Sequence, residues 1–388
     1  MSALLLKGFE VEMYTGRPDG RVVGCAAEAA AALPGFVTEP DQRNLEYVTP
    51  PDSSYRRQLE LLLEPRRQLR QWLAPRGLTL IPGSTLSLGD SGRFERSDPD
   101  NPYHGFIEST YGSRVVTASV HINLGLTAME PLFAGLRLLR CEAALLLALS
   151  ASSPFLDGRV CDAHSQRWLQ FPLTPPEVPL FLDHGHYIGW MEQQLLAGHM
   201  RNVRHLWTSV RPNGPDRPQE LNRLEIRICD LVADPELLLA ITAWTELRLQ
   251  QLLADPRRHD PLQASRLTPE ALATLADAND QAAARSSLDA TLHHWVDGAP
   301  IAARRWLLQT RDAMQPLALS LGLAPLLAPL EPLLDDGPDG GNQAMRWLRR
   351  HQAGESIQAI LSSEIATLEV RERVLHAGLA TDIATPLG

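Results

Sequence analysis

Hydrophobic and polar residues alternate along several short stretches of the first 230 residues. Because successive side chains of a β-strand point to opposite faces, this alternation predicts strands. The alternating stretches, which are rich in bulky residues, are 5–14, 45–48, 78–81, 114–124, 205–210 and 221–230. Helical patterns cover 55–73, 128–149 and, less regularly, 183–196. The first part of the chain is therefore predicted to combine a sheet with helices.

Beyond this first part, the patterns that remain are helical. Residues 234–236 (Asp-Pro-Glu) combine a capping residue, a first-turn proline and an early acid, which predicts a helix to about residue 253. The same signal at 268–270 (Thr-Pro-Glu) predicts a helix to about residue 295. Further helices are predicted over 302–319, 343–351 and 357–374, with no strand beyond 235. We expect an α+β protein in which an all-helical portion, 235–388, packs on a sheet portion, 1–234, as one structural unit.

Three of the predicted strands carry polar or ionisable side chains on one face and apolar side chains on the other. The polar faces hold Glu10 and Glu12; Thr117, Ser119, His121 and Asn123; and Arg223, Glu225, Arg227 and Cys229. The simplest interpretation is an antiparallel sheet with one solvated face. A second interpretation is that the sheet curves and its polar face is covered, in which case these charges must be paired or bound to metal.

Two more acids, Glu39 and Glu46, flank a turn, and Glu46 enters a short predicted strand. Either could be an ordinary surface acid. With the three strand glutamates they make five carboxylates, enough for two or three metal ions that also bind phosphates. Carboxylates with an imidazole, and without thiolates, suit a hard divalent cation, most simply Mg²⁺ or Mn²⁺. The candidate metal ligands are Glu10, Glu12, Glu39, Glu46, His121 and Glu225.

Positive charge comes almost entirely from arginine, since Lys7 is the one lysine among 36 lysines and arginines. A phosphate-binding loop of the G-x-x-x-x-G-K-[ST] type is therefore excluded, and a Schiff-base lysine could only be Lys7. Arg159 and Arg167 lie after the predicted helix 128–149, near small hydroxyl residues, and Arg211 ends a predicted strand. Each could grip a carboxylate or phosphate with two parallel hydrogen bonds. The alternative for each is a surface position in a turn.

The composition narrows the class of protein further. With 44% hydrophobic and 21% charged residues, the 388-residue chain is typical of a folded soluble protein. A net charge of −10 argues against binding to nucleic acid or to an anionic membrane. Four scattered cysteines without a C-x-x-C pair fit a reducing compartment. Since no apolar run reaches the roughly 20 residues of a membrane span and the N-terminus lacks a basic leader, we expect a cytoplasmic protein.

Four motifs occur in a characteristic order: E-V-E at 10–12, V-H-I-N at 120–123, S-A-S-S-P-F-L-D-G-R at 150–159, and R-P followed by L-E-I-R-I-C-D at 224–230. In this combination the chain resembles the bacterial carboxylate–amine ligases of the glutamate–cysteine ligase superfamily, and most closely the cyanobacterial-type branch. The resemblance implies a glutamine-synthetase-like catalytic portion, in which a curved antiparallel sheet forms an active-site funnel backed by helices. It also implies formation of γ-glutamylcysteine from ATP, L-glutamate and L-cysteine through γ-glutamyl phosphate, the first step of glutathione biosynthesis.

The resemblance also implies roles for single residues. Glu10 and Glu12 match the acids that hold Mg²⁺ on the ATP phosphates, and Arg227 matches the arginine that stabilises the transferring phosphoryl group. Glu225 matches the acid beside that arginine, so we expect it to act in catalysis as well as in metal binding. The remaining matches are Glu39, Glu46 and His121 as metal ligands, and Arg159, Arg167, Arg211 and Asn123 as substrate-binding residues.

The same motifs are compatible with other functions. The chain could be a related carboxylate–amine ligase with a different acid or amine substrate, since metal ligands that contact phosphate do not report the amine. It could also be a catalytically silent ATP-binding relative, although five retained carboxylates argue against this. An ATP-grasp ligase is disfavoured because that architecture usually places lysines against the phosphates. An oligomer is possible.

Overall fold

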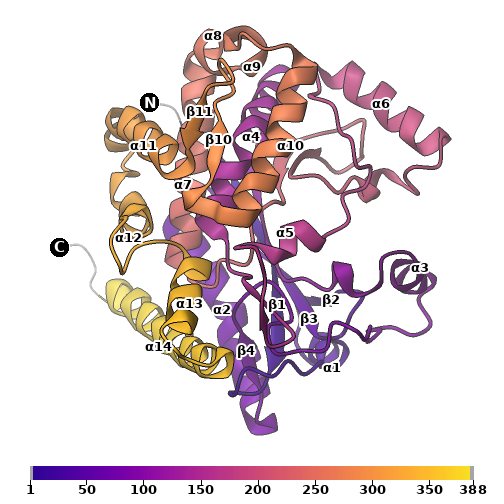
Figure 1. Cartoon of the computed structure of the whole chain (residues 1–388), viewed down its shortest axis with the longest axis vertical. Coiled ribbons are helices and arrows are strands. Elements are labelled where there is room, and N and C mark those ends of the chain that lie inside the picture. Colours follow the sequence, from indigo (N-terminus) through magenta and orange to yellow (C-terminus); the bar gives the residue numbers. More distant parts are fainter. Residues whose placement is uncertain (1–2, 385–388) are drawn as a thin grey trace.

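An antiparallel sheet forms the centre of the protein, for which a computed structural model describes residues 3–384 (Figure 1). Within this part of the chain the sheet has seven strands, and every pairing is antiparallel. The strands follow the order β2 (Phe36–Thr38), β3 (Asn44–Val48), β1 (Lys7–Gly16), β5 (Val120–Gly125), β9 (Arg223–Ile226) and β8 (Val210–Asn213), and β4 (Thr79–Ile81) pairs with the end of β1. The antiparallel sheet predicted from alternation is confirmed.

The register of this sheet places the predicted polar side chains beside one another. Side chains directly opposite each other on antiparallel strands lie about 5 Å apart, so paired residues are neighbours on one face. The cross-strand pairs are Glu12–Glu46, Glu10–His121, Asn123–Glu225 and Arg211–Glu225. The apolar residues between them point to the other face and are buried, among them Phe9, Val11, Met13, Ile122, Leu124 and Ile226.

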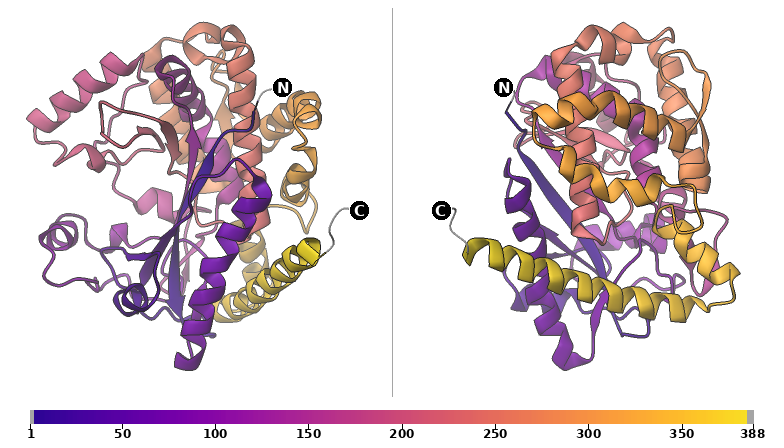
Figure 2. Two further views of the ribbon diagram at one scale, coloured as in Figure 1. Left: turned by 180° about the vertical axis from the view of Figure 1, so that it is seen from behind. Right: turned by 90° about the vertical axis from the view of Figure 1, so that its left-hand side faces the viewer.

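Helices back the apolar face of the sheet. Helix α2 (Tyr55–Leu73) packs on β4, α4 (Met129–Ser150) packs on β8 and β9, and α7 (Pro235–Ala254) contacts both helices. The side chain of Ser54 caps α2, and that of Asp234 caps α7. Helix α4 is buried along almost its whole length because α7 and α10 (Pro269–Ser286) cover its other sides (Figure 2). One hydrophobic cluster includes residues from β1 through α14, so the sheet and the C-terminal helices share a core.

The C-terminal portion is helical, as predicted, apart from one short hairpin. Besides α7 and α10 it contains α11 (Ala303–Ser320), α13 (Gln343–Gln352) and α14 (Ile357–Ala384). Helix α14 crosses the lower half of the molecule in the right-hand view of Figure 2. The helix expected to reach residue 295 ends at Ser286, because Ser287 adopts a positive φ of 43°. The chain then forms β10 (Thr291–His293) and β11 (Pro300–Ala302), so the prediction of no strand beyond 235 was wrong.

Two strand predictions in the first portion need correction. The expected strand 114–124 begins only at Val120, since residues 112–115 form a 3₁₀ turn, and the segment 205–210 is largely irregular. The other elements are α1 (Ala26–Ala32), α3 (Pro102–Tyr111), α5 (Gln166–Gln170), α6 (His184–Leu196), α8 (Pro256–His259), α9 (Pro261–Ala264), α12 (Glu331–Leu334) and the hairpin β6 (Phe155–Leu156) and β7 (Arg159–Val160). None of the helices described here is both long and apolar enough to cross a bilayer.

Candidate active site

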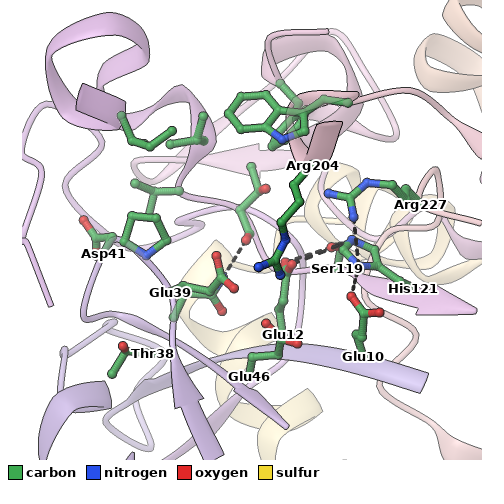
Figure 3. A pocket seen from close by; sticks show the side chains of 18 of the residues that line it. Glu10, Glu12, Thr38, Glu39, Asp41, Glu46, Ser119, His121, Arg204 and Arg227 are labelled. Carbon is green, nitrogen blue, oxygen red and sulfur yellow. Dashed lines mark hydrogen bonds and ion pairs between the residues drawn. The ribbon is translucent and has the colours of Figure 1, made fainter. Parts of the chain in front are cut away.

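A cavity of about 660 Å³ opens on the polar face of the sheet. Acids from β1, β3 and the turn after β2 line one side of it, and arginines from α5, β8, β9 and the loops around these strands line the other (Figure 3). The acidic residues are Glu10, Glu12, Glu39, Asp41 and Glu46, and the arginines are Arg167, Arg204, Arg211, Arg217, Arg223 and Arg227. The polar face is thus covered rather than freely solvated, as in the second interpretation of the strand pattern.

Glu10, His121 and Glu225 offer ligand atoms that all lie within 4.8 Å of one another. Oε2 of Glu10 is 2.9 Å from Nδ1 of His121, which is 3.8 Å from Oε1 of Glu225. Burial by itself would raise the pKa of Glu10, but the hydrogen bond with His121 and the charge of Arg227 bring that pKa below its usual value. Asn123 donates to the other oxygen of Glu10 at 3.2 Å and so holds the carboxylate in place.

Glu12, Glu39 and Glu46 form a second group of carboxylates, at the base of the cavity in Figure 3. Burial raises the pKa of Glu12, and the charge of Glu39 raises it further. Burial together with Glu39 and Glu12 raises the pKa of Glu46 to about 11. These three side chains therefore repel one another when ionised, and a bound cation would remove this repulsion.

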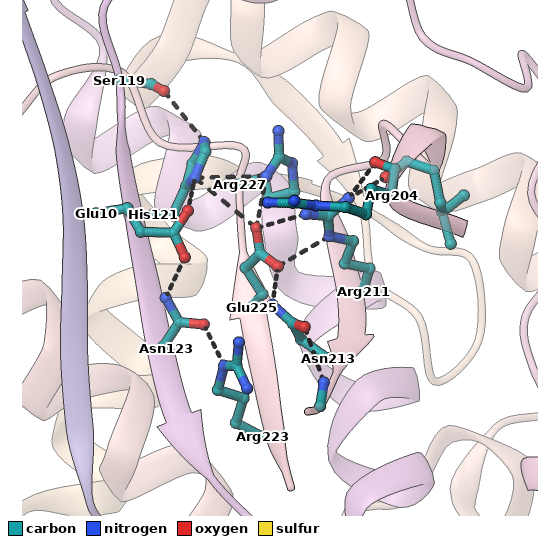
Figure 4. Close-up of polar contacts among 12 residues, drawn as sticks. Glu10, Ser119, His121, Asn123, Arg204, Arg211, Asn213, Arg223, Glu225 and Arg227 are labelled. Atoms are coloured by element: carbon teal, nitrogen blue, oxygen red, sulfur yellow. Dashed lines mark hydrogen bonds and ion pairs between the residues drawn. The ribbon is translucent and has the colours of Figure 1, made fainter. Parts of the chain in front are cut away.

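Glu225 is the most firmly held carboxylate of the site (Figure 4). Arg211 donates to both of its oxygens, at 2.9 and 3.0 Å, and Asn213 donates to Oε2 at 2.5 Å. Arg227 donates to Oε1 at 2.5 Å. Burial opposes ionisation of Glu225, but Arg211 and Arg227 outweigh it and keep its pKa well below the usual value. Because Arg211 is committed to this bidentate pair, it supports Glu225 and has little capacity left for a substrate.

The two arginines that follow α4, Arg159 and Arg167, differ in burial and in their position relative to the cavity. Arg167 is buried and lines the cavity, where it donates to the backbone carbonyls of Ile228 and Arg227 at 3.1 and 3.0 Å. Arg159 lies exposed in the β6–β7 hairpin and does not line the cavity. The substrate-binding role predicted for Arg159 therefore has no support from its position. Asn123, also predicted to bind substrate, is not among the lining residues and instead joins Glu10 to Arg223.

Three lining arginines were not predicted as site residues: Arg204, Arg217 and Arg223. Arg223 lies on the polar face of β9, which the alternation did identify, whereas Arg204 and Arg217 lie in connectors without periodicity. Nη1 of Arg217 is buried and has no hydrogen-bond partner among the described residues. Burial and the nearby charge of Arg211 lower the pKa of Arg217 to about 10. A half-buried guanidinium that has one buried nitrogen without a partner, at a cavity wall, is suited to binding an anion.

Curated bacterial proteins that carry the provisional name glutamate–cysteine ligase 2 match this chain. The Micrococcus luteus protein is 28% identical over 271 residues, which is 68% of this chain and 64% of that protein. The Mycolicibacterium smegmatis protein is 26% identical over 306 residues, which is 78% of this chain and 77% of its own length. A Rubrobacter xylanophilus protein is 26% identical over 232 residues, with 59% and 57% covered. The chain thus matches less than two thirds of the length of two of these relatives.

Two solved structures share the fold. The glutamate–cysteine ligase from Francisella tularensis, in complex with AMP, superimposes with a TM-score of 0.70 at 12% identity, covering 100% of this chain and 96% of that one. A bifunctional glutathione synthetase from Pasteurella multocida gives 0.68 at 15% identity, covering 95% of this chain and 52% of that one. The fold implied by the sequence motifs is thereby confirmed. A family model described as glutamate-cysteine ligase family 2 matches residues 6–363, and the chain belongs to this family.

Proposed function

We propose that this chain is a glutamate–cysteine ligase, which uses ATP to join the γ-carboxylate of L-glutamate to the amine of L-cysteine. The observation that carries the proposal is a covered cavity with glutamates and a histidine on one side and six arginines on the other. Phosphoryl transfer requires neutralisation of phosphate charge and alignment of the reacting oxygens, rather than a protein nucleophile. Membership of the family supports the same class of reaction.

The residues of the cavity fit the divalent cation that such a reaction requires. Burial raises the pKa of Glu46, repulsion from Glu39 and Glu12 raises it further, and a cation would remove this repulsion. Carboxylates with one imidazole match the preference of Mg²⁺ or Mn²⁺. When bound, such an ion neutralises charge on the phosphates of ATP. The proposed ligands are Glu10, Glu12, Glu39, Glu46, His121 and Glu225.

The proposed reaction has two steps. A γ-carboxylate oxygen of glutamate attacks the γ-phosphorus of ATP, and ADP leaves. The amine nitrogen of cysteine then attacks the carbonyl carbon of γ-glutamyl phosphate, the bond from that carbon to the phosphate oxygen breaks, and the nitrogen loses a proton. Inorganic phosphate and γ-glutamylcysteine are the products.

The side chains of the chain itself would orient these groups. Arg227 lies at the cavity with its guanidinium fixed by Glu225, so it is placed to stabilise negative charge on the transferred phosphoryl group. Arg211 contributes by holding Glu225 ionised and in position. Arg167 and Arg217 face the same cavity and are candidates for binding substrate carboxylate or phosphate. Where bound substrates exclude water from such a cavity, these interactions become stronger.

Two other functions remain as outcomes of a test. A ligase that uses a different amine would have the same metal ligands and arginines, since these contact phosphate and carboxylates. A silent relative would bind ATP without turnover. Phosphate release from ATP and glutamate, measured with cysteine and with a panel of other amines, distinguishes the three.

A substitution ties such turnover to the proposed site. Glu12→Gln should abolish Mg²⁺-dependent phosphate release while the fold, measured by circular dichroism, stays intact, because it removes one proposed ligand at constant shape. Glu28→Gln, at an exposed position on α1, is the matched control and should retain wild-type activity. Near wild-type turnover by Glu12→Gln would contradict the assignment of the site.

A further inference from the structure

A buried carboxylate behind the cavity connects several of the segments described above. Asp230 follows β9, is fully buried and does not line the cavity. It forms an isolated β-bridge with Ser119, whose hydroxyl donates to Oε2 of Glu12 at 2.8 Å. Its own backbone N–H donates to the hydroxyl of Ser150 at the end of α4. Asp230 thus lies where β5, β9 and the segment after α4 meet.

The side chain of Asp230 accepts three hydrogen bonds from serines between α4 and α5. Its Oδ2 accepts from the backbone N–H of Ser152 at 2.9 Å and from the hydroxyl of Ser153 at 2.7 Å. Its Oδ1 accepts from the hydroxyl of Ser165 at 2.7 Å. Three donors on two oxygens is the pattern of an ionised carboxylate. Burial raises the pKa of Asp230, and the charge of Arg167 together with these hydrogen bonds opposes that rise.

The same serines hold the start of helix α5. The hydroxyl of Ser153 accepts from the backbone N–H of Arg167 at 3.1 Å, and the hydroxyl of Ser165 accepts from the backbone N–H of Trp168 at 3.2 Å. Each serine therefore donates its proton to Asp230 and offers its lone pair to α5. Because a hydroxyl has a single proton, the acceptor at Asp230 determines which way both hydroxyls point.

The guanidinium of Arg167 is placed by this arrangement rather than by an ion pair. Among residues 3–384, no carboxylate comes within salt-bridge distance of Arg167. Its hydrogen bonds go to the backbone carbonyls of Arg227 and Ile228, which precede Asp230 by three and two residues in the chain. The backbone N–H of Arg167 is thus bonded to Ser153, a partner of Asp230, and its guanidinium is bonded to the segment that leads to Asp230.

We propose that Asp230 is a positioning residue of the ligase, which fixes α5 through Ser153 and Ser165 and thereby holds the Arg167 guanidinium in the cavity. The inference rests on the proposed function, since it assumes that Arg167 acts on an anionic group of a substrate. It assigns a role to a residue that touches neither substrate nor metal.

A double-mutant cycle tests this role. Asp230→Asn and Arg167→Gln should each lower kcat/KM at least tenfold, and the double variant should be no more than threefold worse than Arg167→Gln alone, because both changes remove the same contribution. Additive losses, or an Asp230→Asn variant with wild-type kinetics, would overturn the inference. If Asp230→Asn does not fold, Ser153→Ala takes its place, since it removes the direct link to the Arg167 backbone and leaves the carboxylate.

A second buried carboxylate serves as the matched control. Asp260 accepts two hydrogen bonds from Arg137, at 2.9 and 2.7 Å, and no hydrogen bond joins it to Ser152, Ser153 or Ser165. Asp260→Asn should lower the melting temperature but leave kcat/KM unchanged at assay temperatures below that melting temperature. A loss of kcat/KM as large as that of Asp230→Asn would contradict a specific positioning role of Asp230.

Failure of the proposed function is recognised separately, by a wild-type protein without turnover for any amine. In that case a crystal structure of Asp230→Asn still decides the inference: displacement of the Arg167 guanidinium from the two carbonyls supports it, and an unmoved guanidinium overturns it.

Discussion

Replacement of Glu46 by glutamine should stabilise the metal-free protein and remove its response to Mg²⁺. In the folded state, burial and the neighbouring Glu39 raise the pKa of Glu46 from 4.5 to about 11, so this carboxyl stays protonated at pH 7. In the unfolded chain it ionises above pH 4.5. A group whose folded pKa is raised binds more protons in the folded state, so stability falls as pH rises above the unfolded value.

The magnitude follows from the interval over which ionisation is suppressed. Each pH unit corresponds to about 1.4 kcal/mol, so over the 2.5 units between pH 4.5 and pH 7 the suppressed ionisation of Glu46 destabilises the folded state by roughly 3.5 kcal/mol. Glutamine has nearly the same shape and no proton to lose. The variant should therefore gain up to that amount at pH 7 and almost nothing at pH 4.5. For a chain of 388 residues the gain at pH 7 is a shift of about 4 °C in melting temperature.

Thermal unfolding in the presence of EDTA, followed by circular dichroism at pH 4.5, 6 and 7, measures this effect. In the same scans without EDTA, excess Mg²⁺ should raise the melting temperature of the wild-type protein and not that of the variant, because the variant lacks one proposed ligand. A melting-temperature difference that does not change with pH would refute the electrostatic reasoning. An unchanged Mg²⁺ response would refute the role of Glu46 as a ligand.

Three further predictions concern the positive charges. Arg211→Lys should lose the bidentate pair with Glu225 and with it all turnover. Because breaking a buried pair typically costs about 3–5 kcal/mol, the free energy of unfolding in urea should fall by about 3 kcal/mol. Wild-type turnover by this variant would contradict the role of Arg211. Arg217→Gln should raise the KM for one substrate at least tenfold at unchanged melting temperature, whereas Arg159→Gln should leave all kinetic constants unchanged; equal effects would count against the assigned anion site. Lys7 is fully buried and 3.1 Å from Glu246, so an amine-reactive reagent should not label it in the folded protein, and rapid labelling would contradict the packing.

The shared polar face of the strands could be predicted because alternation is a local property of a strand. Glu10 and Glu12 lie two residues apart, and so do His121 and Asn123, which places each pair on one face whatever its partners are. The pairing of Glu10 with His121 joins residues 111 positions apart in the chain. No local pattern determines such a register, which depends on how the whole sheet assembles.

The arginines show the complementary limit of sequence reasoning. Arg227 and Arg223 lie on a strand and could be placed on its polar face. Arg159 was expected to bind substrate, but Asp157 and Gly158 turn the chain with positive φ values of 50° and 74°, and the β6–β7 hairpin presents Arg159 to solvent. Arg217 lies in an irregular connector, and its position at the cavity depends on tertiary contacts that have no periodic signature.

We propose that the γ-phosphoryl group of ATP is transferred in this cavity to the γ-carboxylate of glutamate before the amine reacts. The most direct test is to incubate the protein with ATP, Mg²⁺, L-cysteine and L-glutamate labelled with ¹⁸O in its γ-carboxylate, and to analyse both products by mass spectrometry. We predict γ-glutamylcysteine together with inorganic phosphate that carries one ¹⁸O atom from glutamate. Unlabelled phosphate, or no dipeptide beside ATP consumption, would contradict the account.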